Sequence, residues 1–178
     1  MIPLNFIYVK NFLITAEKLQ IINNKKRRRI KMSNTKQKSA EASLLCDVYR
    51  NARMGAESII SLLPSVKDEE FKTELTAELE KYDEFAKDAE KRLEEMGEEP
   101  EEEGAFSRMM AKMGIKMNTL MDGTTSHIAQ MISEGCIMGT TDIQKRLNEC
   151  LEYGEAEKLA RQLMSFEEDT IKRMKSYL

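Results

Sequence analysis

The chain of 178 residues is 33% charged and 41% hydrophobic, which is too apolar for a disordered protein and too charged for a membrane protein. This length fits one domain, and no run of about 18 uninterrupted apolar residues is present to form a transmembrane helix. The formal charge of −3 is unevenly distributed, because residues 1–31 contain eight Lys or Arg and one acid, whereas the remainder contains 20 basic and 30 acidic residues.

The first 39 residues contain a basic run, residues 25–31, that ends immediately before Met32. Such a run is typical of a nucleic-acid or membrane-surface patch or of a targeting segment, but its order is wrong for a secretory signal. Its codons can also form a purine-rich bacterial ribosome-binding site in front of a start codon. We favour this interpretation, in which residues 1–39 are a spuriously translated leader and a disordered tail. Nucleic acid is then a partner only if residues 25–31 are genuine.

Two helices are predicted after this tail. Apolar residues recur at three- and four-residue steps over residues 40–63, and Pro64 ends that helix because proline lacks a backbone N–H. Ser65 is the expected N-cap of a second helix over residues 67–96, which Gly97 ends. The residues expected to face the core are Leu45, Val48, Tyr49, Ala52, Ala56, Ile59, Ile60 and Leu63, then Phe71, Leu75, Glu78, Tyr82, Phe85, Ala89, Leu93 and Met96.

An acidic stretch, residues 98–104, follows the second helix and is expected to be a solvated loop. Several methionines then occur within residues 109–121. Thioethers can bind copper or make adaptable contacts with a partner, but we expect these methionines to fill the core of an amphipathic helix.

The third helix is predicted to be irregular. Asp122-Gly123 and Gly139-Thr140-Thr141 can each break it, with Thr124 and Thr140 as the new caps. Gly135 lies inside an apolar stripe, and this position predicts a close helix approach or a kink.

A fourth helix over residues 155–177 completes the pattern, with Leu159, Leu163, Phe166 and Leu178 among its inward positions. No single amphipathic helix can bury its own stripe, so the sequence predicts an all-α four-helix bundle over residues 40–178. Short links make the first two and the last two helices antiparallel hairpins. The longer link between the hairpins can either cross the bundle or turn over, and the sequence leaves both possibilities open.

Two glutamates, Glu78 and Glu167, occupy positions that an amphipathic helix normally gives to leucine. Each lies within about 40° of the centre of an apolar stripe. Carboxylates at such mid-helix core positions hold metals in bundle proteins. The one histidine, His127, lies on neither helix and is expected at the surface.

In architecture, residues 40–178 resemble the ferritin-like superfamily, whose members are two helical hairpins joined by a crossover. Its di-iron members supply a Glu from helices 1 and 3 and an inward Glu-x-x-His from helices 2 and 4. Glu78 and Glu167 match the glutamates of the latter motif, but Lys81 and Thr170 replace the histidines. Three phrases are similar to small bacterial ferritin-like proteins of unknown function: Asn51-Ala52-Arg53-Met54-Gly55, Met117-Asn118-Thr119-Leu120 and Gly135-Cys136-Ile137-Met138-Gly139.

Two buried carboxylates cannot both stay charged without a cation or hydrogen-bond donors. A metal such as Fe or Mn, bound by Glu78 and Glu167, is one resolution. A rotation of the helices that moves both glutamates to the edge of the stripe is another. A third is hydrogen bonding by polar neighbours, for which the candidates are Tyr82, Thr124, Thr170 and Lys81. Because the histidines are missing, we favour the resolutions without a metal.

No nucleophile–base pair, Gly-rich phosphate loop or Ser-His-Asp set is present. The cysteines, Cys46, Cys136 and Cys150, form no C-x-x-C motif and are expected to be reduced filler in a cytoplasmic protein. We therefore predict a non-catalytic bacterial protein without a cofactor, which acts by protein–protein association as a homo-oligomer or with another protein. The alternative is a metal-binding protein with a carboxylate-only site at Glu78 and Glu167, for metal storage or oxidase-type chemistry.

Overall fold

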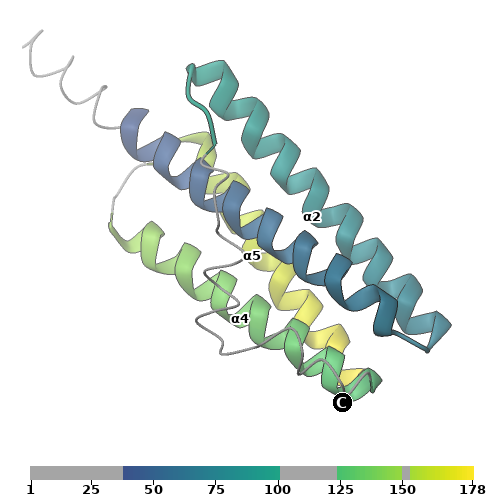
Figure 1. Ribbon diagram of the computed structural model, residues 1–178. Helices are drawn as coiled ribbons and strands as arrows, with labels where there is room; N and C mark the ends of the chain where they lie inside the picture. Colours follow the sequence, from purple (N-terminus) through teal and green to yellow (C-terminus); the bar gives the residue numbers. More distant parts are fainter. Residues whose placement is uncertain (1–37, 101–123, 150–152) are drawn as a thin grey trace, which may run out of the picture. The chain divides into compact units, whose positions relative to one another are not determined.

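The computed structural model describes residues 38–100, 124–149 and 153–178, and the regular structure in these ranges is entirely helical. Residues 38–62 form the first helix, here called the 38–62 helix. It is followed by the 3-10 turn η1 (Leu63–Ser65), the helices α2 (Glu69–Met96), α4 (Thr125–Glu149) and α5 (Glu155–Met174), and the 3-10 turn η3 (Lys175–Tyr177), as Figure 1 shows. The prediction of an all-α bundle is confirmed.

From residue 40 onward the described helices belong to one compact unit. The predicted leader, the basic run of residues 25–31 and the methionine-dense stretch lie outside the described residues, so those interpretations stay predictions. Within the described ranges, no helix combines enough length and hydropathy to span a lipid bilayer.

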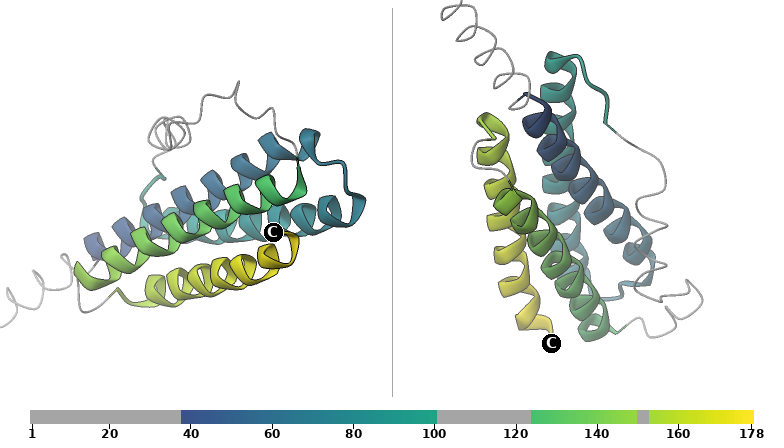
Figure 2. Two further views of the ribbon diagram at one scale, coloured as in Figure 1. Left: turned by 90° about the horizontal axis from the view of Figure 1, so that it is seen from below. Right: turned by 90° about the vertical axis from the view of Figure 1, so that its left-hand side faces the viewer.

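Contacts at the helix ends give the direction of each helix. Arg92, near the end of α2, donates to the carbonyl of Glu155 at the start of α5 (3.1 Å), and Phe71, near the start of α2, packs on Tyr177 with ring centroids 4.5 Å apart. α2 and α5 are therefore antiparallel. Ser126, at the start of α4, donates to the carbonyl of the final residue (3.4 Å), so α4 is also antiparallel to α5. It follows that α2 and α4 run parallel to each other (Figures 1 and 2).

This arrangement decides between the two possible connections of the hairpins. The 38–62 helix and α2 form one antiparallel hairpin, and α4 and α5 form the other (Figure 2). Because α2 and α4 are parallel, α2 ends and α4 begins at opposite ends of the bundle. A simple turn cannot join these two ends.

The core is formed largely by the predicted stripes. Two apolar residues predicted to face inward are instead exposed, namely Ile60 (56%) and Leu178 (63%). Ile60 follows the fully buried Ile59, and a step of about 100° turns it away from the core. Leu178 lies beyond η3 at the end of the chain. The largest fully buried apolar side chains are those of Leu44, Leu45, Val48, Ile59, Phe71, Leu75, Leu93, Ile128, Ile143, Leu163 and Met174.

The N-cap of α2 differs from the prediction. Ser65 ends η1, and the chain then becomes extended at Val66 (φ −76°, ψ 120°). The cap is Asp68, whose Oδ1 accepts a hydrogen bond from the backbone N–H of Phe71 (2.9 Å). At the other end, Gly97 adopts the left-handed conformation (φ 74°), as expected for a residue that ends a helix.

α4 is continuous through Gly139-Thr140-Thr141, so the predicted break at this point is wrong. Thr140 does not cap a new helix. Its hydroxyl and that of Thr141 donate to carbonyls one turn earlier, those of Cys136 (2.9 Å) and Ile137 (2.6 Å). A glycine inside a helix costs about 1 kcal/mol, which burial of the surrounding apolar residues can offset. The other predicted cap is confirmed, because Thr124 accepts from the backbone N–H of His127 (3.3 Å).

Removal of the α2 cap is expected to weaken the fold measurably. Asp68→Ala should lower the free energy of unfolding by about 1 kcal/mol, because the Phe71 N–H loses its acceptor. Ser65→Ala is the matched control and should change it by less than about 0.5 kcal/mol. Urea denaturation measures both variants, and a larger loss for Ser65→Ala would show that the cap has been misassigned.

Candidate functional site

Glu78 and Glu167 both point into the bundle, with exposed fractions of 3% and 1%. They lie on facing helices, α2 and α5. Each glutamate accepts a hydrogen bond from a residue of the opposite helix, one turn along from the glutamate of that helix. Thr170, three residues after Glu167, bonds Glu78, whereas Tyr82, four residues after Glu78, bonds Glu167. The two carboxyl groups therefore occupy successive levels of the same core and have separate sets of partners.

Glu78 has a positively charged partner within the protein. Its Oε1 accepts from Nε of Arg173 (2.9 Å) and from a second nitrogen of the same guanidinium, and its Oε2 accepts from the hydroxyl of Thr170 (2.7 Å). Arg173 also pairs with Glu74 (2.9 Å). The Arg173 side chain is 41% exposed, whereas the side chain of Glu78 is buried. Arg173 thus reaches from the bundle surface and supplies the charge that Glu78 needs.

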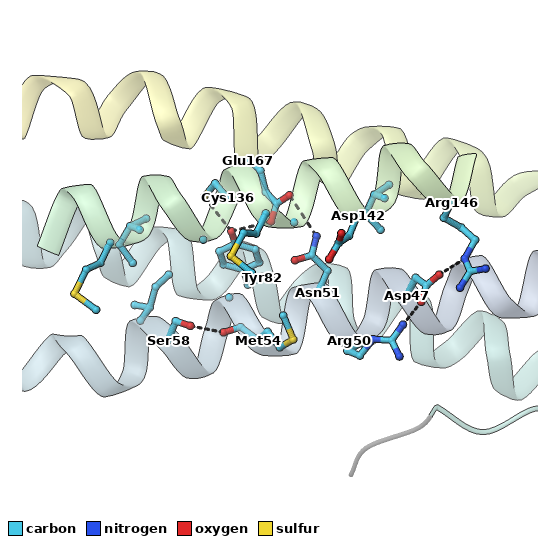
Figure 3. A pocket seen from close by; sticks show the side chains of 18 of the residues that line it. Asp47, Arg50, Asn51, Met54, Ser58, Tyr82, Cys136, Asp142, Arg146 and Glu167 are labelled. Carbon is cyan, nitrogen blue, oxygen red and sulfur yellow. Dashed lines mark hydrogen bonds and ion pairs between the residues drawn. The ribbon is translucent and has the colours of Figure 1, made fainter. Parts of the chain in front are cut away.

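Glu167 belongs to a different group, here called the Glu167 cluster, which comprises Asn51, Tyr82, Cys136 and Glu167. The carboxyl oxygens accept from the amide of Asn51 (3.3 Å) and from the hydroxyl of Tyr82 (3.3 Å). The same hydroxyl lies 3.5 Å from the thiol of Cys136. Each of the four helices contributes one member, and Figure 3 shows their side chains converging.

The members of the Glu167 cluster are shifted toward their uncharged forms. Burial raises the pKa of the Glu167 carboxyl from 4.5 to about 8, against the opposing effect of its bonds from Asn51 and Tyr82. Burial, with the nearby Glu167, raises the pKa of the Cys136 thiol to about 12. Burial, together with the nearby Cys136 and Glu167, raises the pKa of Tyr82 well above its ordinary value. At neutral pH the cluster is therefore mainly a carboxylic acid, a phenol and a thiol.

Two glycines make room for this cluster. A Cβ on Gly55 would lie 2.5 Å from the ring of Tyr82, and a Cβ on Gly139 would lie 2.6 Å from both Asn51 Oδ1 and Glu167 Oε1. Real Cβ atoms essentially never approach other atoms this closely, so any larger residue would displace the polar groups. These glycines lie in two of the three phrases on which the resemblance rests, and the structure gives a physical reason for both.

A groove of about 310 Å³ opens above the cluster, between the 38–62 helix and α4 (Figure 3). Gly135 faces it, because a Cβ there would meet nothing within 4 Å. The predicted close approach at Gly135 is therefore wrong, and this glycine leaves open space instead. The alternative of a kink stays a prediction. The Glu167 cluster forms the floor of the groove, and its apolar lining comes from Met54, Ile59, Leu62, Met131, Ile132, Met138 and Ile143.

One end of the groove is charged. Asp47 on the 38–62 helix pairs with Arg50 on the same helix and with Arg146 on α4, and Arg146 also pairs with Glu149 (2.8 Å). These ion pairs join the two walls of the groove at that end. Asp142 of α4 also lines the groove, between this charged end and the Glu167 cluster, and apolar side chains line the groove over the cluster (Figure 3).

The donor set around the two glutamates does not fit a di-metal carboxylate centre. Within the described ranges, no three His, Cys, Asp or Glu side chains come together as potential metal ligands. Glu78 accepts from a guanidinium and a hydroxyl, and Glu167 accepts from an amide and a phenol. The first and third helices of a di-iron protein each supply a glutamate, and here Glu57 on the 38–62 helix and Glu134 on α4 are off the core. Glu57 forms an ion pair with Arg53, and Glu134 accepts a hydrogen bond from Gln130. The carboxylate-only metal site stays a prediction that metal analysis can test.

Sequence reasoning identified some partners of the glutamates and missed others. Tyr82 and Thr170 were predicted correctly, whereas Lys81 pairs with Glu84 on the surface (2.6 Å) and Thr124 caps α4. Arg173 was missed, although the three-residue spacing of Glu167, Thr170 and Arg173 puts all of them on one helix face. Asn51 and Cys136 were also missed. Their signals were a position within or beside an apolar stripe and their occurrence in the phrases quoted for the resemblance.

Removal of the guanidinium should leave Glu78 buried and unpaired. Arg173→Met is expected to lower the free energy of unfolding by about 2 kcal/mol, which is less than the roughly 3–5 kcal/mol for a fully buried pair because Arg173 is partly exposed. Lys172→Met, at the neighbouring position, breaks only an exposed pair with Asp169 and should leave the free energy of unfolding nearly unchanged. The double variant Arg173→Met/Glu78→Leu should recover much of the loss, and its failure to do so would contradict the assigned pairing.

The raised pKa of Glu167 makes stability depend on pH. Between pH 4.5 and about 8 the folded carboxyl keeps a proton that the unfolded carboxyl has released, so stability falls as pH rises through this window. Glu167→Gln removes this titration while keeping the shape. We expect the stability of the variant relative to the unmodified protein to increase by about 1.4 kcal/mol per pH unit between pH 5 and 8. A constant difference across chemical denaturations at these pH values would show that Glu167 titrates normally.

In a comparison with known protein families, residues 40–152 match a family model described as "Domain of unknown function (DUF2383)". No curated protein and no solved structure matches the chain. The matched range contains Asn51, Gly55, Glu78, Tyr82 and Gly139 and ends before α5. Since the model covers more than half of the chain, the protein belongs to this DUF2383 family.

Proposed function

We propose that this protein is a non-catalytic helical bundle that acts by association, and that the groove between the 38–62 helix and α4 is its binding surface. The partner that we propose is a second copy of the chain. The observation that supports this most directly is the open groove of about 310 Å³, with apolar walls over a floor of convergent polar groups.

The chemistry of the buried groups supports a role without catalysis. A general base should be available in its charged form and in reach of substrate. Glu78 is bonded to Arg173 and Thr170, and the raised pKa of Glu167 keeps it mainly protonated at neutral pH. Cys136 is the described thiol nearest to them, and its pKa of about 12 makes it a poor nucleophile.

We further propose that the bundle is a ferritin-like protein that has lost its metal chemistry. The parallel direction of α2 and α4, with one long link between the two hairpins, supports this kinship because ferritin-like folds have one crossover. In this proposal Arg173 provides the positive charge that a metal would supply beside Glu78, and Asn51 and Tyr82 bond a carboxyl that needs no counter-ion while protonated.

Filling the groove should weaken the association. Gly135→Leu projects a side chain into the space that this glycine leaves open, whereas Gly135→Ala adds one methyl group and leaves most of the volume free. Sedimentation velocity of the full chain across micromolar concentrations should show reversible association that Gly135→Leu weakens at least tenfold and Gly135→Ala retains. A chain that stays monomeric at every concentration, or associates equally well as Gly135→Leu, would contradict the proposal.

The metal-binding alternative is tested separately. Protein purified without chelator should contain Fe, Mn and Zn well below one ion per chain, because the donor set around the glutamates does not fit a metal centre. Stoichiometric metal that is lost in the double variant Glu78→Gln/Glu167→Gln would overturn our preference and establish the carboxylate site.

A further inference from the structure

We infer that the groove takes a lysine side chain of the associating chain, with the ammonium placed against the Glu167 carboxylate. This inference rests on the proposed function, because it assumes that the groove is the binding surface. It goes further by stating the chemical group that the floor of the groove recognises.

The two buried glutamates differ in one respect that motivates this inference. Glu78 is paired with Arg173, so its charge is compensated within the chain. Glu167 receives only the neutral amide of Asn51 and the neutral hydroxyl of Tyr82, and no Lys or Arg of the described ranges forms an ion pair with it. It also lies at the floor of an open groove. A carboxylate has about four acceptor positions, which leaves capacity for a donor that enters from the groove.

The shape and polarity of the groove match lysine. A lysine side chain has a flexible four-carbon apolar stem that ends in a compact charge with three donors. The stem can lie along apolar walls while the charged end reaches a polar group. Here Met54, Met131 and Met138 provide adaptable apolar walls, and Glu167 provides at the floor a carboxyl group that becomes ionised when an ammonium binds. The planar guanidinium of arginine needs wider, two-pronged access to a carboxylate.

The chain itself can supply the lysine. Lys87, Lys91 and Lys158 are among the lysines whose side chains are exposed on the outer faces of the bundle. A second copy therefore presents positive groups on stems long enough to enter a groove. The acidic carboxyl at the floor of one copy is complementary to these groups on another.

Binding would replace the proton of the Glu167 carboxyl by an ammonium ion at the floor of the groove. The free carboxyl is mainly protonated at neutral pH, and an incoming ammonium displaces this proton, which leaves to solvent. The affinity for an ammonium should therefore rise by about tenfold per pH unit until Glu167 is ionised at about pH 8. Lysine, with an ordinary pKa of about 10.4, stays charged over this range.

Several titratable and charged groups surround Glu167 or line the groove, and the variant Glu167→Gln separates their effect from that of Glu167. From α2 and α4, Tyr82 and Cys136 face the carboxyl with pKa values raised far above neutral. The Glu78–Arg173 pair lies one turn away, and the Asp47, Arg50 and Arg146 ion pairs lie at the charged end of the groove. The groove is also lined by three further charged residues of α4, namely Asp142, its ion-pair partner Lys145, and Glu149. The one histidine of the chain does not line the groove.

Two small probes test the recognition of the ammonium on the full chain. n-Butylamine reproduces the end of a lysine side chain, and n-butanol has the same carbon chain without the charge. Titrations followed by NMR should show n-butylamine binding about tenfold more tightly at pH 7 than at pH 6, and n-butanol binding equally at both. Equal binding of n-butylamine at the two pH values would overturn the inference.

Two variants separate this inference from the proposed function. Gly135→Leu fills the groove and should abolish binding of both probes. Glu167→Gln keeps the groove and should leave n-butanol binding unchanged while it removes the pH dependence of n-butylamine binding. If neither probe binds, or Gly135→Leu has no effect on binding, the groove itself is wrong. If n-butanol binds in the groove but Glu167→Gln leaves n-butylamine unaffected, the groove stands and the ammonium inference is wrong.

A further experiment with two peptides tests whether the ammonium that binds in the groove is that of a lysine residue in a protein chain. A short acetylated and amidated peptide with a single lysine should bind more tightly than n-butylamine and should dissociate the self-associated chain. The same peptide with norleucine in place of lysine has a matched stem without the nitrogen and should do neither. Equal competition by the two peptides, or tighter binding of the free amine than of the lysine peptide, would overturn the assignment to a lysine of a second copy.

Discussion

Two carboxyl groups in the core are the constraint on which the rest of this structure depends. Taking a carboxylate out of water is costly unless a cation or several donors compensate it. The bundle uses a different solution at each level. Glu78 receives a guanidinium and a hydroxyl, whereas Glu167 accepts two neutral donors and carries a proton at neutral pH. Every buried side-chain nitrogen and oxygen within the described ranges has a hydrogen-bond partner.

The glycines follow from this constraint. Bringing one side chain from each of four helices to a common point requires backbone positions without a Cβ. Gly55 gives room to the ring of Tyr82, which Phe166 contacts from the other hairpin with ring centroids 5.0 Å apart. Gly139 gives room to Asn51 and Glu167. Gly135, one turn earlier on α4, meets no neighbour and leaves the groove open above the cluster. Glycines of one helix thus have opposite roles in packing.

The sequence predicted the elements of the fold well because hydrophobic periodicity reports directly which helix face is buried. The inward positions of Glu78 and Glu167 followed from the same periodicity. Prediction from periodicity failed for features that tertiary contacts determine. The effect of Gly139 on α4 depended on packing across the bundle, and the direction of the link between the hairpins depended on which helix ends meet.

The partners of the glutamates were only partly predictable, for a related reason. Thr170 and Tyr82 lie on the helices of the two glutamates, so a helical repeat places them nearby. Asn51 and Cys136 come from the other two helices, and their contacts depend on the relative rotation of those helices, which periodicity does not give. The groove could not be predicted at all, because an open space between helices has no sequence pattern of its own.

The central claim is that the core contains one ion-paired carboxylate and one carboxyl that is protonated at neutral pH. An NMR titration of the glutamate side-chain carboxyl carbons tests it most directly, with Glu167→Gln used to assign the signal. The account predicts one glutamate carboxyl that titrates near pH 8 and is absent from the variant. A Glu167 signal that completes its titration around the ordinary glutamate value, about 4.3, would contradict it.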